Sequence, residues 1–205
     1  MIDRPVIFLD KDGTLIQDIP YNVDPRKMVF EPGAVNGLRR LFEAGYRFVV
    51  VTNQSGVARG YFREEALQAV EYRLREMMQT EASVPLDAFY YCPHHPDGTV
   101  PQYAVECTCR KPEPGMLYQA AQERSISLNT SWMIGDILND VEAGKRAGCR
   151  TVLLDVGHET EWQDGPHRRP DLMVTNLEEA AEWIIKSQRL APVTKFSGGS
   201  QTFYE

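Results

Sequence analysis

The chain has 205 residues, of which 42% are hydrophobic and 25% are charged, and its formal net charge is −7. This composition is typical of a globular protein and argues against a chain that is disordered throughout. The acidic balance disfavours a nucleic-acid or anionic-membrane partner, because such partners are bound through basic faces. The length suits one α/β domain with a complete core.

The first residues carry an acid at position 3 and no apolar run of signal-peptide length. No stretch approaches the roughly 18 apolar residues that span a bilayer. We therefore expect a cytoplasmic protein, in which thiols stay reduced and clustered cysteines favour metal binding over disulfides. We expect a monomer that binds neither nucleic acid nor membrane.

Short apolar runs rich in β-branched and aromatic residues recur along the chain and predict buried strands at 5–9, 46–52, 87–91, 131–135 and 150–155. Segments with helical spacing lie between and after them, at 34–45, 63–80, 115–125, 139–148 and 177–188. Strands that alternate with helices predict an α/β protein with a doubly wound, mainly parallel sheet. In such a sheet, ligands bind beyond the carboxyl ends of the strands.

We assign residues 1–188 to one folded domain, into which residues 92–109 are inserted as a loop. From about Leu190 the sequence loses its periodicity and carries Gly-Gly flanked by serines. Residues 189–205 are therefore predicted to be a flexible tail.

The first predicted strand ends in FLDKDGTL, where Asp10 and Asp12 are separated by one residue and Gly13 permits a tight turn. A carboxylate at a strand tip can attack phosphorus when cations neutralise its charge, and a second carboxyl nearby can carry the proton of the leaving group. An isolated pair of this kind is more often a solvated turn or a helix cap, but the flanking residues favour the catalytic interpretation.

Two further predicted strands also end in polar side chains. The second ends at Thr52 and Asn53, whose hydroxyl and amide can face an anion, and the fourth is followed by Asp136 and Asp140. The two acids are four residues apart and so share one face of a helix. Turns and helix caps are the ordinary explanation of such residues. Here each group follows a strand of the same predicted sheet.

A basic pair, Arg110 and Lys111, precedes Pro112, which disfavours helix at that point. Basic pairs usually lie on the surface. However, the order D-x-D, T-N, R-K and G-D-x-x-x-D over residues 5–155 resembles the haloacid dehalogenase superfamily of phosphotransferases. The resemblance implies a Rossmann-like fold and the activity of a phosphoric monoester hydrolase.

The resemblance also implies roles for the motif residues. Asp10 would be the nucleophile that forms an aspartyl-phosphate, and Asp12 the general acid and then the base for the hydrolytic water. Thr52 and Lys111 would stabilise the transferring phosphoryl group, whose charge requires preplaced donors and cations. The implied Mg²⁺ ligands are the carboxylates of Asp10 and Asp136 and the backbone carbonyl of Asp12, with Asp140 in a supporting position.

Residues 90–112 hold three of the four cysteines and two of the four histidines of the chain. In an extended segment, residues two apart point the same way, so Cys92 pairs with His94 and Cys107 with Cys109. Together they predict a closed Cys₃His zinc site, which is structural because no position is left for water. A redox pair, or a core cysteine with surface histidines, is the alternative, and His95 is the rival fourth ligand.

The sequence of this loop resembles particular groups of phosphatases within the superfamily. The pattern CPHHPDG…CTCRKPEPGM strongly resembles the D-glycero-D-manno-heptose 1,7-bisphosphate 7-phosphatases, and nearly as well the histidinol-phosphate phosphatases. Both groups have a minimal cap, and a phosphorylated sugar, losing its 7-phosphate, is the first implied substrate. Ile137 stands where the family usually has a basic residue. The chain therefore lacks one positive charge that could bind a second anionic group of the substrate. The implied substrate-binding residues are Asp18, Tyr21, Asn53, Gln54, Ser55 and Arg110.

Two non-enzymatic alternatives fit the sequence less well. A phosphoacceptor domain also uses an aspartate at a strand end, but it has no need of the Asp12 acid or of a zinc loop. A zinc-bearing interaction module would be free to lose Asp10 or Lys111, which this chain has kept.

Overall fold

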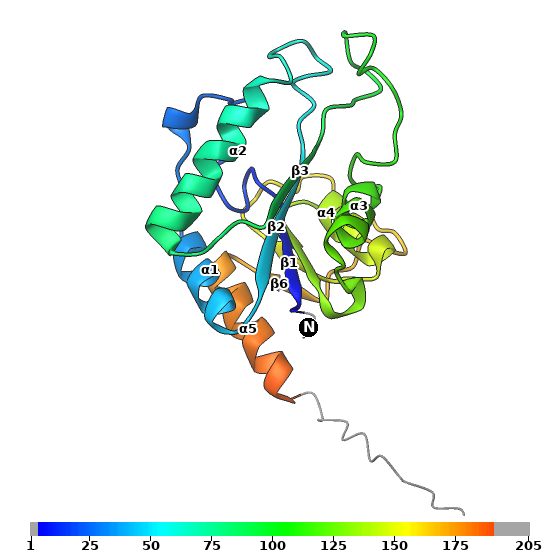
Figure 1. The fold of residues 1–205 in the computed structure, drawn as a ribbon. Helices are drawn as coiled ribbons and strands as arrows, with labels where there is room; N and C mark the ends of the chain where they lie inside the picture. Colours follow the sequence, from blue (N-terminus) through cyan, green and yellow to red (C-terminus); the bar gives the residue numbers. More distant parts are fainter. Residues whose placement is uncertain (1–3, 191–205) are drawn as a thin grey trace, which may run out of the picture.

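A computed structural model describes residues 4–190 of the chain. Within them, six parallel strands form one sheet in the order β3-β2-β1-β4-β5-β6 (Figure 1). This is the predicted doubly wound α/β fold, with β1 between β2 and β4. The strands are β1 (Val6–Leu9), β2 (Arg47–Asn53), β3 (Ala88–Cys92), β4 (Trp132–Gly135), β5 (Arg150–Leu154) and β6 (Leu172–Val174).

Helices cover both faces of the sheet (Figure 1). Each predicted helix is present, and their observed ends differ from the predicted ones by a few residues. None of the helices in residues 4–190 has both the length and the apolar character needed to cross a membrane. The helices are α1 (Ala34–Glu43), α2 (Ala66–Met77), α3 (Gly115–Arg124), α4 (Leu138–Ala147) and α5 (Leu177–Leu190), with a π-helical turn (Met78–Ala82) after α2 and two 3₁₀ turns (Pro25–Lys27 and Leu128–Thr130).

Two details of the chain path differ from the prediction. The edge strand β6 was not predicted, because three residues are too few to show a period and its central Met173 is 53% exposed. Helix α5 continues to Leu190, two residues past its predicted end. The rest of the predicted tail, 191–205, lies outside the described residues.

The sheet is packed on both faces, which makes its carboxyl edge a fixed platform. In β1, Ile7 and Leu9 face a core made with α1, α2 and α5, whereas Val6 and Phe8 face a core made with α3 and α4. All four side chains are fully buried. Burial of one such side chain contributes roughly 1.5–3 kcal/mol, so this strand is held without help from any ligand.

The polar motif residues lie where these apolar strands end. Leu9 is in register with Val50 of β2 and with Ile134 of β4, so the ends of the three strands lie side by side. The residues that follow therefore share one edge of the sheet. This is the position at which ligands bind in sheets with this strand order.

Candidate active site and thiolate cluster

Asp10 and Lys111 form the centre of the site at the sheet edge. The Lys111 Nζ donates to Asp10 Oδ1 at 2.6 Å and to the carbonyl oxygen of Val51 at 2.9 Å, and it pairs with Asp140 Oδ1 at 2.6 Å. Burial alone would lower the pKa of the Lys111 ammonium, but the charges of Asp10 and Asp140 outweigh it and raise the pKa. Lys111 is therefore a fixed cation beside Asp10.

Three carboxylates crowd together at this point. Asp10, Asp136 and Asp140 each place an oxygen within 4.8 Å of the others, and all three are buried. Burial raises the pKa of Asp136 to about 6 and that of Asp140 to about 7, and the charge of Asp10 adds to both shifts. A divalent cation would relieve this repulsion, and carboxylate oxygens are the ligands that Mg²⁺ prefers. The donor set therefore fits such an ion.

Asp12 lies on the turn after β1 and faces the solvent side of the site. Its Oδ1 accepts from Lys11 Nζ at 2.6 Å, its Oδ2 accepts from Gln54 Nε2 at 3.1 Å, and its side chain is 29% exposed. Burial raises the pKa of the Asp12 carboxyl above its ordinary value. A carboxyl with a raised pKa is suited to hold and release a proton near neutral pH.

The end of β2 supplies two residues with different tasks. Thr52 is buried, and its hydroxyl oxygen accepts from Gln54 Nε2 at 2.9 Å. The Asn53 side chain donates to the carbonyl of Lys111 and accepts from its N–H, both at 3.0 Å. Asn53 was expected to face an anion. Its amide is also bonded to the backbone of Lys111, and these two bonds fix the position of that lysine.

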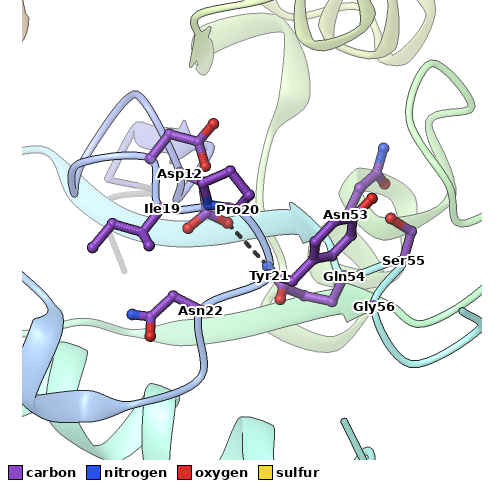
Figure 2. A pocket seen from close by; sticks show the side chains of 10 residues that line it. Asp12, Ile19, Pro20, Tyr21, Asn22, Asn53, Gln54, Ser55 and Gly56 are labelled. Atoms are coloured by element: carbon purple, nitrogen blue, oxygen red, sulfur yellow. Dashed lines mark hydrogen bonds between the residues drawn. The ribbon is translucent and has the colours of Figure 1, made fainter. Parts of the chain in front are cut away.

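A pocket of about 300 Å³ opens beside Asp12 (Figure 2). The loop before Asn22 forms one wall, and the turn after β2 forms the other. Five of the six residues predicted to bind substrate line it. The lining residues are Asp12, Asp18, Ile19, Pro20, Tyr21, Asn22, Asn53, Gln54, Ser55 and Gly56.

Arg110, the remaining residue predicted to bind substrate, does not line this pocket. It borders a separate cavity of about 660 Å³ together with Lys111 and Asn139, and its Nη1 donates to the carbonyl of His94 at 3.4 Å. The two cavities share no lining residue.

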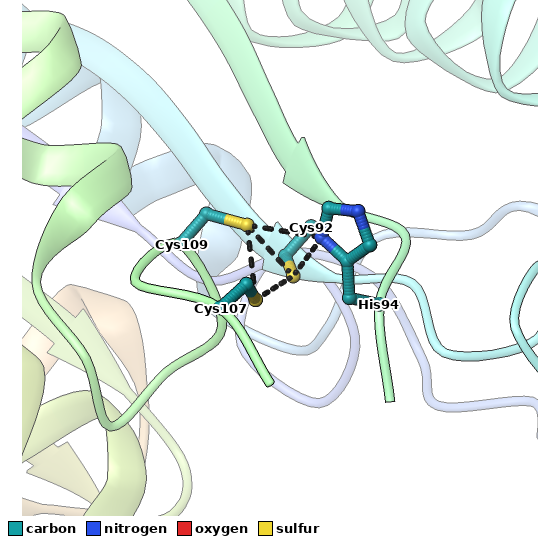
Figure 3. Close-up of side chains that lie close together, drawn as sticks. All are labelled: Cys92, His94, Cys107 and Cys109. Atoms are coloured by element: carbon teal, nitrogen blue, oxygen red, sulfur yellow. Dashed lines mark hydrogen bonds between the residues drawn. The ribbon is translucent and has the colours of Figure 1, made fainter. Parts of the chain in front are cut away.

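The second cluster, called here the thiolate cluster, consists of Cys92, His94, Cys107 and Cys109 (Figure 3). The three sulfur atoms are 3.1–3.5 Å apart, and His94 Nδ1 is 3.4 Å from Cys109 Sγ and 3.7 Å from Cys92 Sγ. Tetrahedral zinc with Zn–S bonds of about 2.3 Å would place its sulfur ligands roughly 3.8 Å apart. All four cysteines of the chain are free thiols. The cluster therefore fits zinc with only small adjustments.

Electrostatics and the neighbouring histidine agree with this ligand set. The hydrogen bond between the sulfur atoms of Cys92 and Cys109 lowers the pKa of the Cys109 thiol to about 5, which favours a thiolate at this position. His95 turns elsewhere: its Nε2 lies 3.1 Å from Arg59 Nη2, and its Nδ1 accepts from the N–H of Asp97 at 3.1 Å. His94, not His95, faces the cysteines.

Several residues at the site were not predicted from the sequence, among them Lys11, Asn22 and His158. His158 lies in the loop after β5, and its Nδ1 is 2.8 Å from Asp136 Oδ2. The rule that ligands bind beyond strand ends points to this loop. This rule does not say which residue of an irregular loop reaches the site. A single histidine outside any motif does not indicate a role either.

The sequence matches known hydrolases and phosphatases. The family model for HAD-hydrolase-like proteins matches residues 108–180. A D-glycero-beta-D-manno-heptose-1,7-bisphosphate 7-phosphatase from Photorhabdus laumondii is 42% identical over 89% of this chain and 90% of its own length. A phosphatase from the same organism, named for the alpha anomer, is 38% identical over 76% of this chain and 85% of its own length.

Solved structures agree with these relatives. The D,D-heptose 1,7-bisphosphate phosphatase of B. bronchiseptica, solved with magnesium and phosphate, is 30% identical with a TM-score of 0.71 and covers 89% of this chain and 99% of its own. A HAD-like protein from Mesorhizobium loti is 35% identical with a TM-score of 0.77, covering 90% and 87%.

Proposed function

The chain belongs to the haloacid dehalogenase-like hydrolases, in the group of the heptose-bisphosphate phosphatases, and on this premise we propose that it removes the 7-phosphate of D-glycero-D-manno-heptose 1,7-bisphosphate. It is thus a phosphatase, a phosphoric monoester hydrolase. The observation that supports the chemistry best is the buried contact of Lys111 with both Asp10 and Asp140 at 2.6 Å. The relatives are named for both anomers, so the proposal covers both.

Two different metal ions complete the proposal. Mg²⁺ would be held by Asp10 and Asp136 at the sheet edge, with the backbone carbonyl of Asp12 as a further ligand and Asp140 behind them. When bound, it would neutralise charge on the phosphate and on the carboxylates. Zinc would be held by the thiolate cluster, and its role would be to order the loop that ends at Arg110 and Lys111.

In the first chemical step, a carboxylate oxygen of Asp10 attacks the phosphorus atom and the bond from phosphorus to the sugar oxygen breaks. The departing alkoxide takes a proton from Asp12, whose raised pKa suits it to carry one. Lys111 and the Thr52 hydroxyl stabilise the charge on the phosphoryl oxygens. The products are an aspartyl-phosphate on Asp10 and the free alcohol.

In the second step, water attacks the phosphorus of the aspartyl-phosphate. Asp12, now a carboxylate, takes a proton from this water while the bond between phosphorus and Asp10 breaks. Inorganic phosphate leaves, and both side chains return to their starting states. The Lys11 and Gln54 contacts keep Asp12 over the pocket throughout.

The pocket beside Asp12 supports a sugar substrate. Its walls carry the polar side chains of Asp18, Asn22 and Ser55, and hydroxyl groups of a sugar need such partners. Arg110, which borders the other cavity, would bind the phosphate that is not transferred. This arrangement separates the reacting phosphate from the group that identifies the substrate.

The test is phosphate release by the purified full chain with Mg²⁺ and a panel of substrates. The panel contains both anomers of the heptose bisphosphate, the corresponding monophosphates and histidinol phosphate. We expect the highest kcat/KM for a heptose bisphosphate, and no release by Asp10→Asn in parallel. A preference for histidinol phosphate would show that the proposed substrate is wrong. If no phosphate ester is hydrolysed, the proposed phosphatase chemistry is wrong.

A further inference from the structure

The long loop between β5 and β6, residues 155–171, leaves the carboxyl edge of the sheet and returns beside α4. Loops of more than about 12–15 residues without regular structure are uncommon in compact domains and are often functional. The chemistry proposed above uses no residue from it. Four of its side chains nevertheless reach the candidate active site or the helix that follows Asp136; they are those of His158, Glu159, Arg168 and Asp171.

His158 makes the most direct of these contacts. Its Nδ1 lies 2.8 Å from Asp136 Oδ2, while the Thr14 hydroxyl donates to Asp136 Oδ1 at 3.0 Å. An ionised carboxylate only accepts hydrogen bonds, so the imidazole donates from Nδ1. Each oxygen of Asp136 thus has one donor and keeps a further lone-pair site. Two donors from separate segments fix the plane of this carboxylate.

Two other contacts hold the loop in place independently of His158. Glu159 Oε2 accepts from the N–H of Leu138 at 2.7 Å, in the first turn of α4. Arg168 Nη1 donates to Asn139 Oδ1 at 3.1 Å and to Glu142 Oε2 at 2.8 Å. The loop is therefore fixed to the N-terminal turns of α4 at two positions, both of which follow His158 in the sequence. Its position does not depend on the imidazole.

The turn after β1 leaves room for this contact. A Cβ atom on Gly13 would collide with both Asp136 Oδ2 and His158 Nδ1, and Gly13 has a φ of +77°. The His158 side chain is 36% exposed, whereas that of Asp136 is 6% exposed. The imidazole thus lies against the turn, on the solvent side of a buried carboxylate.

We propose that His158 is a positioning residue, which holds the Asp136 carboxylate in the orientation that binds the divalent ion. This inference rests on the proposed function, because it assigns Mg²⁺ to Asp136. Partners that hydrogen-bond a metal-ligating carboxylate orient it, and their loss typically costs about 10–100-fold in metal affinity or activity. His158 takes no part in bond making or proton transfer.

The test compares Mg²⁺ binding to the full chain and to three variants by titration calorimetry. In His158→Ala the donor is lost, and we expect Mg²⁺ to bind about 10–100-fold more weakly. In His158→Asn an amide nitrogen can take the place of Nδ1, and most of the affinity should return. The matched control is His167→Ala, an exposed histidine of the same loop, which should bind Mg²⁺ as the parent does.

Kinetics at varied Mg²⁺ separates positioning from a general structural effect. His158→Ala should need more Mg²⁺ for half-maximal activity, while its KM for substrate at saturating Mg²⁺ and its thermal midpoint stay near those of the parent. If the parent is active and His158→Ala binds Mg²⁺ as tightly as the parent or more tightly, the inference about His158 is wrong while the proposed function still stands. A parent that neither binds Mg²⁺ nor hydrolyses phosphate esters would overturn the proposed function and this inference together.

Discussion

The two clusters of candidate ligands are built in opposite ways. The carboxylates of Asp10, Asp136 and Asp140 follow strands from distant parts of the sequence, and Asp12 beside them opens to a pocket. The thiolate cluster draws all four candidate ligands from residues 92–109, and their ligand atoms all lie within 4.8 Å of one another. A site for chemistry needs an accessible side, whereas a site that orders a loop is best closed.

Their dependence on metal should differ for the same reason. Asp10 and Asp136 directly follow strands, and Asp140 lies in the first turn of α4, so all three belong to a core that is packed without an ion. The loop of the thiolate cluster has no regular secondary structure between Cys92 and Gly115, so much of its order should come from binding zinc. Changes at the first cluster should abolish activity and preserve the fold. Changes at the second should act on stability first.

The largest effect is expected from Asp10→Asn. The amide keeps the shape and an oxygen for Lys111 but cannot act as the nucleophile, so kcat should fall on the order of 10⁴-fold or more. Circular dichroism and the thermal midpoint should match the parent. If this variant retains more than a trace of phosphate release, the aspartyl-phosphate mechanism is wrong.

The second-largest loss of activity is expected from Asp12→Asn. It removes the proton carrier while Lys11 and Gln54 remain in place, and general acid–base help is typically worth about 10²–10⁴-fold. Single-turnover kinetics with a substrate that has a good leaving group, such as a nitrophenyl phosphate, provides the matched measurement, because that leaving group needs little protonation. Equal losses with both substrates would contradict the role as general acid.

The sequence predicted the parts of the site that depend on local pattern. An apolar strand followed by FLDKDGTL, VVVTNQSG or MIGDILND places polar groups at one sheet edge, since parallel strands end together. The cluster of candidate ligands in residues 92–109 was predicted from the spacing of its residues in an extended segment. Strand β6 was missed because it is short and half-exposed.

Features that depend on how segments meet could not be predicted. His158 reaches Asp136 only because its loop is fixed to α4 by Glu159 and Arg168. The side chain of Asn53 meets the backbone of Lys111, although they are 58 positions apart. Such contacts are set by tertiary packing, and neither periodicity nor motif spacing carries that information.

The double substitution Cys107→Ser and Cys109→Ser tests the second cluster. We expect one zinc per chain in the parent and none in the variant, with a thermal midpoint lower on the order of 10 °C, since metal binding stabilises the loop. Elemental analysis and thermal unfolding are the measurements. Cys149→Ser is the control, because this buried cysteine lies outside the cluster and the variant should keep its zinc. Undiminished zinc in the double variant would refute the ligand assignment.

Arg110→Ala tests a residue that lies between the two clusters, because Arg110 directly follows Cys109 of the thiolate cluster and borders the cavity beside Lys111. Loss of a charge-assisted contact to phosphate should cost about 2–4 kcal/mol, or roughly 30- to 900-fold in kcat/KM for the heptose bisphosphate. Zinc content should be unchanged, which separates recognition from loop order. A variant as active as the parent on the bisphosphate would remove Arg110 from the binding site.

The smallest effect is expected from Ile137→Lys, which restores a cation where the family usually has one. Ile137 is partly exposed at the start of α4, and its backbone N–H donates to Asp140 Oδ2 at 3.3 Å, a bond that does not use the side chain. An exposed ion pair is worth about 0.2–1 kcal/mol, so the preference for the bisphosphate over a monophosphate should rise at most about fivefold. Ile137→Gln, similar in length but uncharged, should leave this preference unchanged, and added salt should reduce the gain in the lysine variant because it screens exposed charges. Competition kinetics measures the ratio directly. If lysine and glutamine give the same ratio, position 137 does not face the second phosphate, and the recognition of that phosphate falls to Arg110 alone among the residues proposed for it.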